Sequence, residues 1–328
     1  MSIIKTDNLT FSYKNDIKEK VVLKGLNIDI EEGSFTAIIG HNGSGKSTFA
    51  KHLNAILLPS GGSVTVCGID SKDEEKLFEL RKCAGMVFQN TDVLIITVFC
   101  GLKVVSVYSV YKLVTSHLSS LLQSLYSSIS FALGQTFSTD KQLFGKLLDA
   151  VDVYFGGICY TVYTIAAALF IPFINLYTKG VMDVAYADLT VSLLFVVVEL
   201  LTFSRMPMLN TINYAGHFKN TLPQTLIETA INLTVSLIFV CFLGMRGVLW
   251  GTVVALLYRN VDIFLYTNHK ILERSAKKTF CIYGLDTLLF ISMLIGINAV
   301  PYSIESYLDF IKAGLFLTPV VLGVYLLA

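Results

Sequence analysis

Eight residues near the N-terminus have the types and spacing of a phosphate-binding loop. Gly40-His-Asn-Gly-Ser-Gly-Lys-Ser47 matches the pattern G-x-x-x-x-G-K-[ST] and lies between a predicted strand and a predicted helix, the context that such a loop requires. Glycines let successive backbone N–H groups point inward at phosphate oxygens. We therefore expect Lys46 to contact the β- and γ-phosphates of a nucleotide and Ser47 to hold Mg²⁺. The residues expected to surround the nucleotide are Gly40, Asn42, Gly43, Ser44, Gly45, Lys46, Ser47 and Thr48.

The elements around this loop follow from the apolar pattern. Residues 3–13 and 21–30 alternate apolar with polar side chains, which predicts two antiparallel strands. The run Ser34-Phe-Thr-Ala-Ile-Ile-Gly40 is short and apolar, as in the buried strands of parallel sheets. After Lys46, the residues Phe49, Leu53 and Ile56 share one helical face, which predicts a helix packed on the sheet.

These residues resemble the ATP-binding subunits of ABC transporters, particularly those of energy-coupling factor importers. The likeness covers about residues 1–90 and rests on the phosphate loop and on the segments 8–13, 58–68 and 85–90. It implies ATP and Mg²⁺ as cofactors, and ABC partner subunits. It also implies that Tyr13 stacks on adenine and that Gln89 senses the γ-phosphate beside the metal. Taken as bare residues, Tyr13 reads as a strand aromatic and Gln89 as a surface amide.

The resemblance stops after Gln89. An ABC ATPase also needs an L-S-G-G-Q signature, an apolar strand ending in Asp-Glu and a switch histidine, and the sequence shows none of them. The nearest match to the metal strand, residues 193–199, continues into an apolar stretch and carries a single acid, Glu199. ATP binding is therefore expected without a positioned base for hydrolysis. The strand around Ile38 would face an open sheet edge, which predicts a weakly stable fragment.

Charge is distributed unevenly along the chain. The 328 residues are 54% hydrophobic and 15% charged. Residues 1–92 carry 11 Lys/Arg and 12 Asp/Glu, whereas the 236 residues from 93 to 328 carry 14 and 12. This predicts a water-soluble nucleotide-binding domain over 1–92, located in the cytoplasm, and a transmembrane domain over 93–328. A net charge of +1 gives no field to recruit nucleic acid.

Apolar stretches of about 20 residues are long enough to cross a bilayer. Such stretches recur after Asp92, with residues 93–101 as a half-span, and predict a multi-pass protein of the plasma membrane. The expected spans are 103–137, 153–177, 188–209, 224–244, 247–268, 279–299 and 309–328.

Ionisable residues inside these spans are candidates for transport, because a charge in lipid is costly unless it is paired or wetted. They are Glu199, Arg205, Glu228, Arg259 and Asp262. Arg259 and Asp262, three residues apart, can meet on one helix face, whereas Glu199 and Arg205 are too far apart for a local pair. Structural bridging, or snorkelling to the membrane interface, remains an alternative role for these residues.

The second part of the chain resembles polysaccharide flippases of the multidrug/oligosaccharidyl-lipid/polysaccharide superfamily. The likeness rests on the segments 90–96, 105–111, 171–180, 215–220 and 247–252, and on Arg259. It implies membrane lipid and a lipid-linked oligosaccharide as partners. Such flippases have two lobes, and this chain supplies one, which leaves a homodimer as a way to rebuild the cavity.

Three hypotheses follow. The preferred one is a chimera: a partial α/β P-loop NTPase fragment of ABC type followed by an all-α bundle of about seven spans, without a complete activity. The second is a half-size polysaccharide exporter that works as a dimer. The third is a fused ABC transporter with ATP-driven transport.

Overall fold

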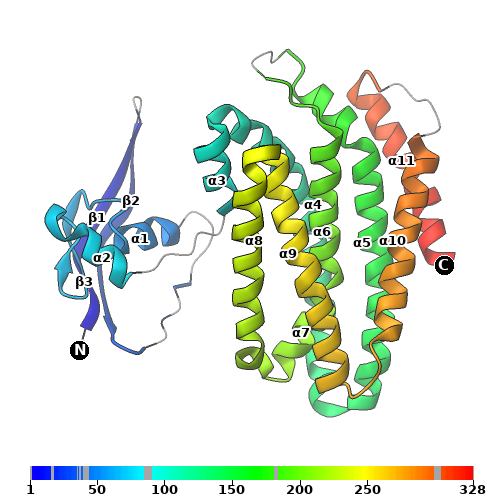
Figure 1. Ribbon diagram of the computed structural model, residues 1–328, viewed down its shortest axis with the longest axis horizontal. Coiled ribbons are helices and arrows are strands. Elements are labelled where there is room, and N and C mark those ends of the chain that lie inside the picture. The colour runs from blue at the N-terminus through cyan, green and yellow to red at the C-terminus, as the bar shows by residue number, and fades with distance from the viewer. Residues whose placement is uncertain are drawn as a thin grey trace. The chain divides into compact units, whose positions relative to one another are not determined.

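The chain divides into two compact units, Met1–Gln89 and Asn90–Ala328. The first unit combines a small sheet with short helices, and the second consists of long helices (Figure 1). The computed structural model describes residues 2–15, 18–34, 36, 38–39, 44–84, 91–180, 184–298 and 304–327.

The sheet of the first unit is built on a long hairpin. Strands β1 (Ser2–Asn15) and β2 (Lys18–Glu31) pair antiparallel, with Ile4 opposite Ile30 and Phe11 opposite Leu23. This confirms the two antiparallel strands that the alternating pattern predicts. Strand β3 (Gly61–Val66) pairs antiparallel with the other edge of β1, and β4 (Ile69–Asp70) pairs with β3, which gives the order β2-β1-β3-β4.

Short helices join this sheet to complete a small core. They are α1 (Lys46–Leu53), the 3₁₀ turn η1 (Glu74–Lys76) and α2 (Leu77–Cys83). Leu9 and Phe11 of β1 are buried together with Phe49 of α1, Val64 of β3 and Leu80 of α2. The alternation in β1 and the helical spacing in α1 therefore bring their apolar side chains into one cluster.

The prediction of a strand over residues 34–40 is wrong for the described residues of that run. Among the described residues of that run, Thr36, Ile38 and Ile39 belong to no strand, and the Ile39 side chain is 92% exposed. All described strand pairs are antiparallel, so the expected parallel sheet is absent from the described residues. An apolar run becomes a buried strand only where neighbouring strands take up its backbone hydrogen bonds, and no described strand pairs with this one.

In the described part of the second unit, all regular secondary structure is helical (Figure 1). Its helices are α3 (Thr91–Cys100), α4 (Leu102–Thr139), α5 (Lys141–Tyr177), α6 (Leu189–Ser204), α7 (Met206–Tyr214), α8 (Leu222–Leu243), α9 (Met245–Tyr266), α10 (Lys277–Asn298) and α11 (Tyr307–Leu327), with the short turns η2 (His217–Thr221) and η3 (Thr267–Ile271). Within the described residues, six helical segments are long and apolar enough to cross a membrane.

The helices differ from the predicted spans in three respects: one in apolar character and two in their boundaries. Helix α4 has 38 residues but is rich in serine and is not one of the six apolar segments, so the count of seven spans stays a prediction. Helix α5 begins well before residue 153, because Asp140 Oδ1 caps it by accepting from the N–H groups of Gln142 and Leu143, each at 2.9 Å. The stretch 188–209 is divided between α6 and α7 at Arg205, since Pro207 has no N–H to continue the helical ladder.

Helix α5 lies at the centre of the helical unit and packs against α4, α6, α10 and α11. Aromatic rings fill the space between α4, α5 and α6: Tyr111 stacks with Phe170 and Phe195 at centroid separations of 5.2 and 5.7 Å. Because this core is closely packed, polar side chains that enter it need partners of their own.

Candidate functional site

The described half of the phosphate loop turns directly into α1. Gly45 has φ +95°, and its carbonyl accepts the N–H of Phe49 at 2.8 Å, so the helix follows without a break. No side chain of the described residues caps this end of α1, which leaves its first-turn N–H groups without a side-chain acceptor. Gly40, Asn42 and Gly43 lie outside the described residues.

Gly45 is required by space as well as by backbone angle. A methyl group at this position would lie 3.0 Å from Leu23 Cδ2 and 3.2 Å from Val22 Cγ1. Gly45 therefore lies directly against β2, and only glycine combines this close approach with a positive φ.

The side chains after Gly45 have the chemistry that a nucleotide requires. Lys46 Nζ lies 3.5 Å from Ser44 Oγ, and Ser47 is exposed. An uncapped helix N-terminus favours anions through its N–H groups and its dipole. This donor set fits a phosphate group with Mg²⁺: Lys46 and the backbone would hold the phosphates, and Ser47 the metal.

Tyr13 lies next to this helix. Its hydroxyl is 3.4 Å from Thr48 Oγ1, and its ring meets Phe11 edge-on at a centroid separation of 5.0 Å. The structure thus brings Tyr13 to the start of α1, with the ring partly exposed. Both the stacking role and the role of a strand aromatic are compatible with this position. Gln89, assigned to the γ-phosphate and the metal, lies outside the described residues.

His52 is a buried residue of α1 and is not part of the phosphate-loop motif. Its Nδ1 lies 2.7 Å from the Thr48 carbonyl oxygen, and its ring packs edge-on against Phe11 at 4.7 Å. Burial lowers the pKa of His52 from its ordinary value of 6.5, because desolvation outweighs the hydrogen bond to the Thr48 carbonyl. Folding of this unit therefore favours the neutral form of the His52 imidazole.

Four of the five predicted intramembrane charges form one network. Arg205 Nη1 lies 2.7 Å from Glu228 Oε1, and Arg259 Nε lies 3.6 Å from Glu228 Oε2. Arg259 also bonds Asp262, the partner that its spacing allows, and is almost fully buried. The network links α8 and α9 to the junction of α6 and α7. Its two cations face two acids, which fits the bridging role left open by the sequence.

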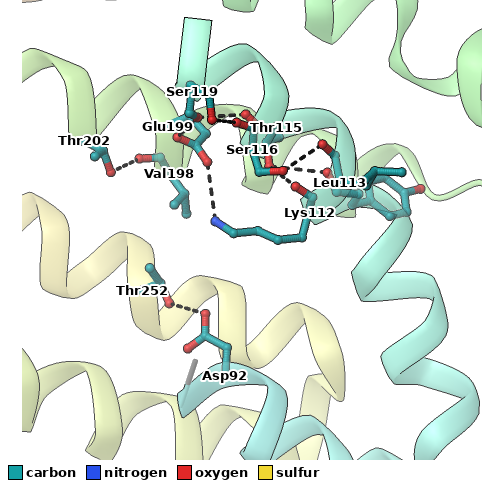
Figure 2. Close-up of polar contacts among 12 residues, drawn as sticks. Asp92, Lys112, Leu113, Thr115, Ser116, Ser119, Val198, Glu199, Thr202 and Thr252 are labelled. Carbon is teal, nitrogen blue, oxygen red and sulfur yellow. Dashed lines mark hydrogen bonds and ion pairs between the residues drawn. The ribbon is translucent and has the colours of Figure 1, made fainter. Parts of the chain in front are cut away.

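Glu199 belongs to a different cluster, shown in Figure 2. Lys112 Nζ of α4 lies 3.6 Å from Glu199 Oε1 of α6, and Ser119 donates to Glu199 Oε2 at 2.7 Å. The Tyr163 hydroxyl of α5 is 2.9 Å from Ser119 Oγ. Glu199 is therefore buried with a cation and a hydroxyl donor, and Arg205 is not its partner.

Lys112 and Asp92 are polar residues of this cluster that the choice of candidates missed. Asp92 Oδ2 of α3 lies 3.5 Å from Thr252 Oγ1 of α9 (Figure 2). It also lies 3.3 Å from the Tyr108 hydroxyl, and the positive charge of Lys112 interacts with the Asp92 carboxylate. The signal for Lys112 is a lysine inside the apolar stretch 103–137, nine residues from its start. Five helices, α3, α4, α5, α6 and α9, thus contribute charged or hydroxyl groups to one region of the bundle.

Comparisons with known proteins concern the first part of the chain. The model of the ABC transporter family matches residues 23–108. The energy-coupling factor transporter ATP-binding protein EcfA1 of Clostridium perfringens is 52% identical over 93 residues, which are 28% of this chain and 33% of that protein. The protein of the same name from Clostridioides difficile is 48% identical over 91 residues, with the same coverage. The Bacillus subtilis protein is 46% identical over 90 residues, 27% of this chain and 31% of its own length.

The chain spans about a third of the length of these curated relatives. No solved structure matches it. The N-terminal part is thus similar to a piece of an ABC transporter ATP-binding protein. It is followed by a helical part in which, among the described residues, six segments are long and apolar enough to cross a membrane.

Proposed function

We propose that the chain is a membrane-bound nucleotide-binding protein, in which a truncated ABC-type ATPase fragment binds ATP with Mg²⁺ and a flippase-like half-bundle holds it in the membrane. The observation that carries the nucleotide site is the conformation of Gly45, which leads Lys46, Ser47 and Thr48 into an uncapped helix N-terminus. The relatives named above support ATP as the nucleotide, since their names describe ATP-binding proteins of transporters.

Each described residue has one task in this proposal. The first-turn N–H groups and Lys46 bind the phosphates, Ser47 holds the metal, and Tyr13 contacts the base. Bound ATP–Mg²⁺ would supply a phosphoryl group activated by the metal. Because the sequence after Gln89 carries no L-S-G-G-Q signature and no strand ending in Asp-Glu, we propose binding without efficient hydrolysis.

Binding is tested with a fluorescent ATP analogue on the full chain in detergent, with Mg²⁺ or with a chelator. Lys46→Ala should abolish binding. Lys51→Ala, in the last turn of the same helix, should leave it unchanged. Equal binding by wild type and Lys46→Ala would refute the assignment. ATP turnover above that of Lys46→Ala would instead support the fused-transporter alternative, with ABC partner subunits to be sought.

For the helical unit we propose descent from a flippase of lipid-linked oligosaccharides, whose pyrophosphate calls for cationic side chains. Lys112 is the best placed of the cations discussed above, because its side chain is 46% exposed, whereas Arg259 is buried among acids. The alternative of a half-size exporter predicts translocation of a fluorescent lipid-linked oligosaccharide by a purified homodimer in vesicles. That activity should be lost in Lys112→Ala and retained in Lys103→Ala, at the start of the same helix.

A further inference from the structure

A groove lies between α10 and α11. Both helices pack on α5 more extensively than on each other. Tyr160 of α5 contacts Phe290 of α10 and Tyr325 of α11, with ring centroids 6.4 and 6.0 Å apart. Toward the C-terminal end of α10 and the N-terminal half of α11, the space between the two helices remains open. Figure 1 shows both helices beside α5.

The groove has a volume of about 520 Å³ and is lined almost entirely by apolar atoms. Ligand pockets in proteins span roughly 300–1,000 Å³, so its size suits a bound molecule. Gly296 contributes to the open space, because a methyl group there would meet no atom within 4 Å. The apolar residues that line it include Met293, Gly296, Ile297, Phe316, Leu317 and Val320.

One cation lines this apolar groove. Lys312 lies in the second turn of α11, close to the helix end. Within the described residues, no salt bridge reaches its ammonium group, and the nearby carboxylate of Asp309 interacts with its charge at longer range. Asp309, one turn earlier, accepts a hydrogen bond from Ser306 at 2.7 Å. A lysine near the end of a membrane helix places its charge at the level of the lipid headgroups while its stem covers apolar surface.

We propose that this groove binds an acyl chain of an anionic membrane lipid, with Lys312 against the headgroup phosphate. An apolar trough with a cation near one end matches an amphiphile that carries a negative charge, and α10 and α11 are two of the apolar segments long enough to span a membrane. The inference goes beyond the proposed nucleotide site and does not depend on it.

The experiment uses the full chain in lipid vesicles with a tryptophan placed in the groove. Trp250, the single tryptophan, is changed by Trp250→Phe, and Phe316→Trp introduces the reporter at an exposed lining position. Brominated phosphatidylglycerol should quench this reporter at a mole fraction about fivefold lower than brominated phosphatidylcholine, the effect of one basic residue at an anionic surface. Lys312→Gln should make the two lipids equal.

Two glycines of α10 give a matched pair for the groove itself. Gly296→Leu fills the groove and should reduce quenching by both lipids. Gly284→Leu adds the same side chain to the same helix at another open, exposed position and should leave quenching unchanged. The proposal would be overturned if the two lipids quenched equally in the reporter protein that keeps Lys312. It would also be overturned if Gly296→Leu and Gly284→Leu changed quenching equally. Quenching that depends on the protein-to-lipid ratio would overturn it as well, because it would indicate that a second copy of the chain fills the groove.

Discussion

The ammonium nitrogen of Lys112 lies 3.6 Å from Glu199 Oε1, so a lysine in the N-terminal third of α4 balances an acid buried in α6. The two side chains are unequal: that of Lys112 is 46% exposed and that of Glu199 is 8% exposed. Ser119 supplies a second contact to Glu199. Loss of the lysine therefore leaves a buried charge without its cation, whereas loss of the acid leaves a cation that solvent can reach.

This asymmetry predicts unequal costs. Lys112→Met should lower the free energy of unfolding by about 1–3 kcal/mol, the usual cost of leaving a buried polar group without its partner. Glu199→Gln should cost less, because Ser119 can still donate to the amide oxygen. Denaturant unfolding in mixed micelles measures both values, and the double variant should recover part of the Lys112→Met loss. Lys103→Met serves as the exposed control, and equal costs for the two single variants would contradict the prediction.

The phosphate loop gives a prediction about glycine. Gly45→Ala should lower the free energy of unfolding of the N-terminal unit by more than the roughly 1–3 kcal/mol that an unfavourable backbone angle alone costs. The added methyl group would also press on Leu23 and Val22. Hydrogen exchange of the α1 amides in the full chain measures this change without separating the units.

Gly68→Ala is the matched control for this substitution. Gly68 also has a positive φ, +78°, but a methyl group there meets nothing within 4 Å. Gly68→Ala should therefore lower the free energy of unfolding only by the cost of the unfavourable backbone angle. If the α1 amides exchanged at the same rate in both alanine variants, the close approach of β2 to Gly45 would not matter for stability.

Local patterns predicted what local interactions determine. The alternation around Leu23 predicted β2, and the spacing of Arg259 and Asp262 predicted their contact. The partner of Glu199 could not be found this way, because Lys112 is far away in the sequence and only the packing of α4 on α6 brings the two together. The run containing Ile39 has the apolar pattern of a buried strand, yet its described residues form no strand and Ile39 is exposed. A strand also needs neighbouring strands to pair with, and no local pattern shows whether they are present.

Burial of His52 predicts acid sensitivity of the N-terminal unit. Its pKa lies below the unfolded value of 6.5, so both states are neutral above that pH and stability is fully present. Below it, the unfolded chain takes up a proton that the folded chain resists, and stability falls by up to about 1.4 kcal/mol per pH unit. Hydrogen exchange of α1, corrected for its intrinsic pH dependence, should show this slope.

The slope should disappear in His52→Asn, which keeps an N–H donor near the Thr48 carbonyl but does not titrate. The absolute stability of this variant will fall at every pH because a ring is lost from the core. The comparison therefore uses the slope of stability against pH and not the absolute stability. His117→Asn, at an exposed position on α4, should leave the slope unchanged, and an equal slope in wild type and His52→Asn would assign the acid sensitivity to other groups.

Helices α8 and α9 approach so closely that glycine is needed between them. A methyl group at Gly247 would collide with the Phe239 carbonyl, and one at Gly251 would collide with Ser236, whose hydroxyl donates to the Val248 carbonyl at 3.2 Å. Small residues four positions apart permit such backbone contact in membranes. Gly251→Ala should therefore force the helices apart and cost about 1–3 kcal/mol, as overpacking does. Denaturant unfolding in mixed micelles should show this loss beside an unchanged Gly284→Ala control, and equal stability of the two variants would mean that α8 and α9 can separate freely.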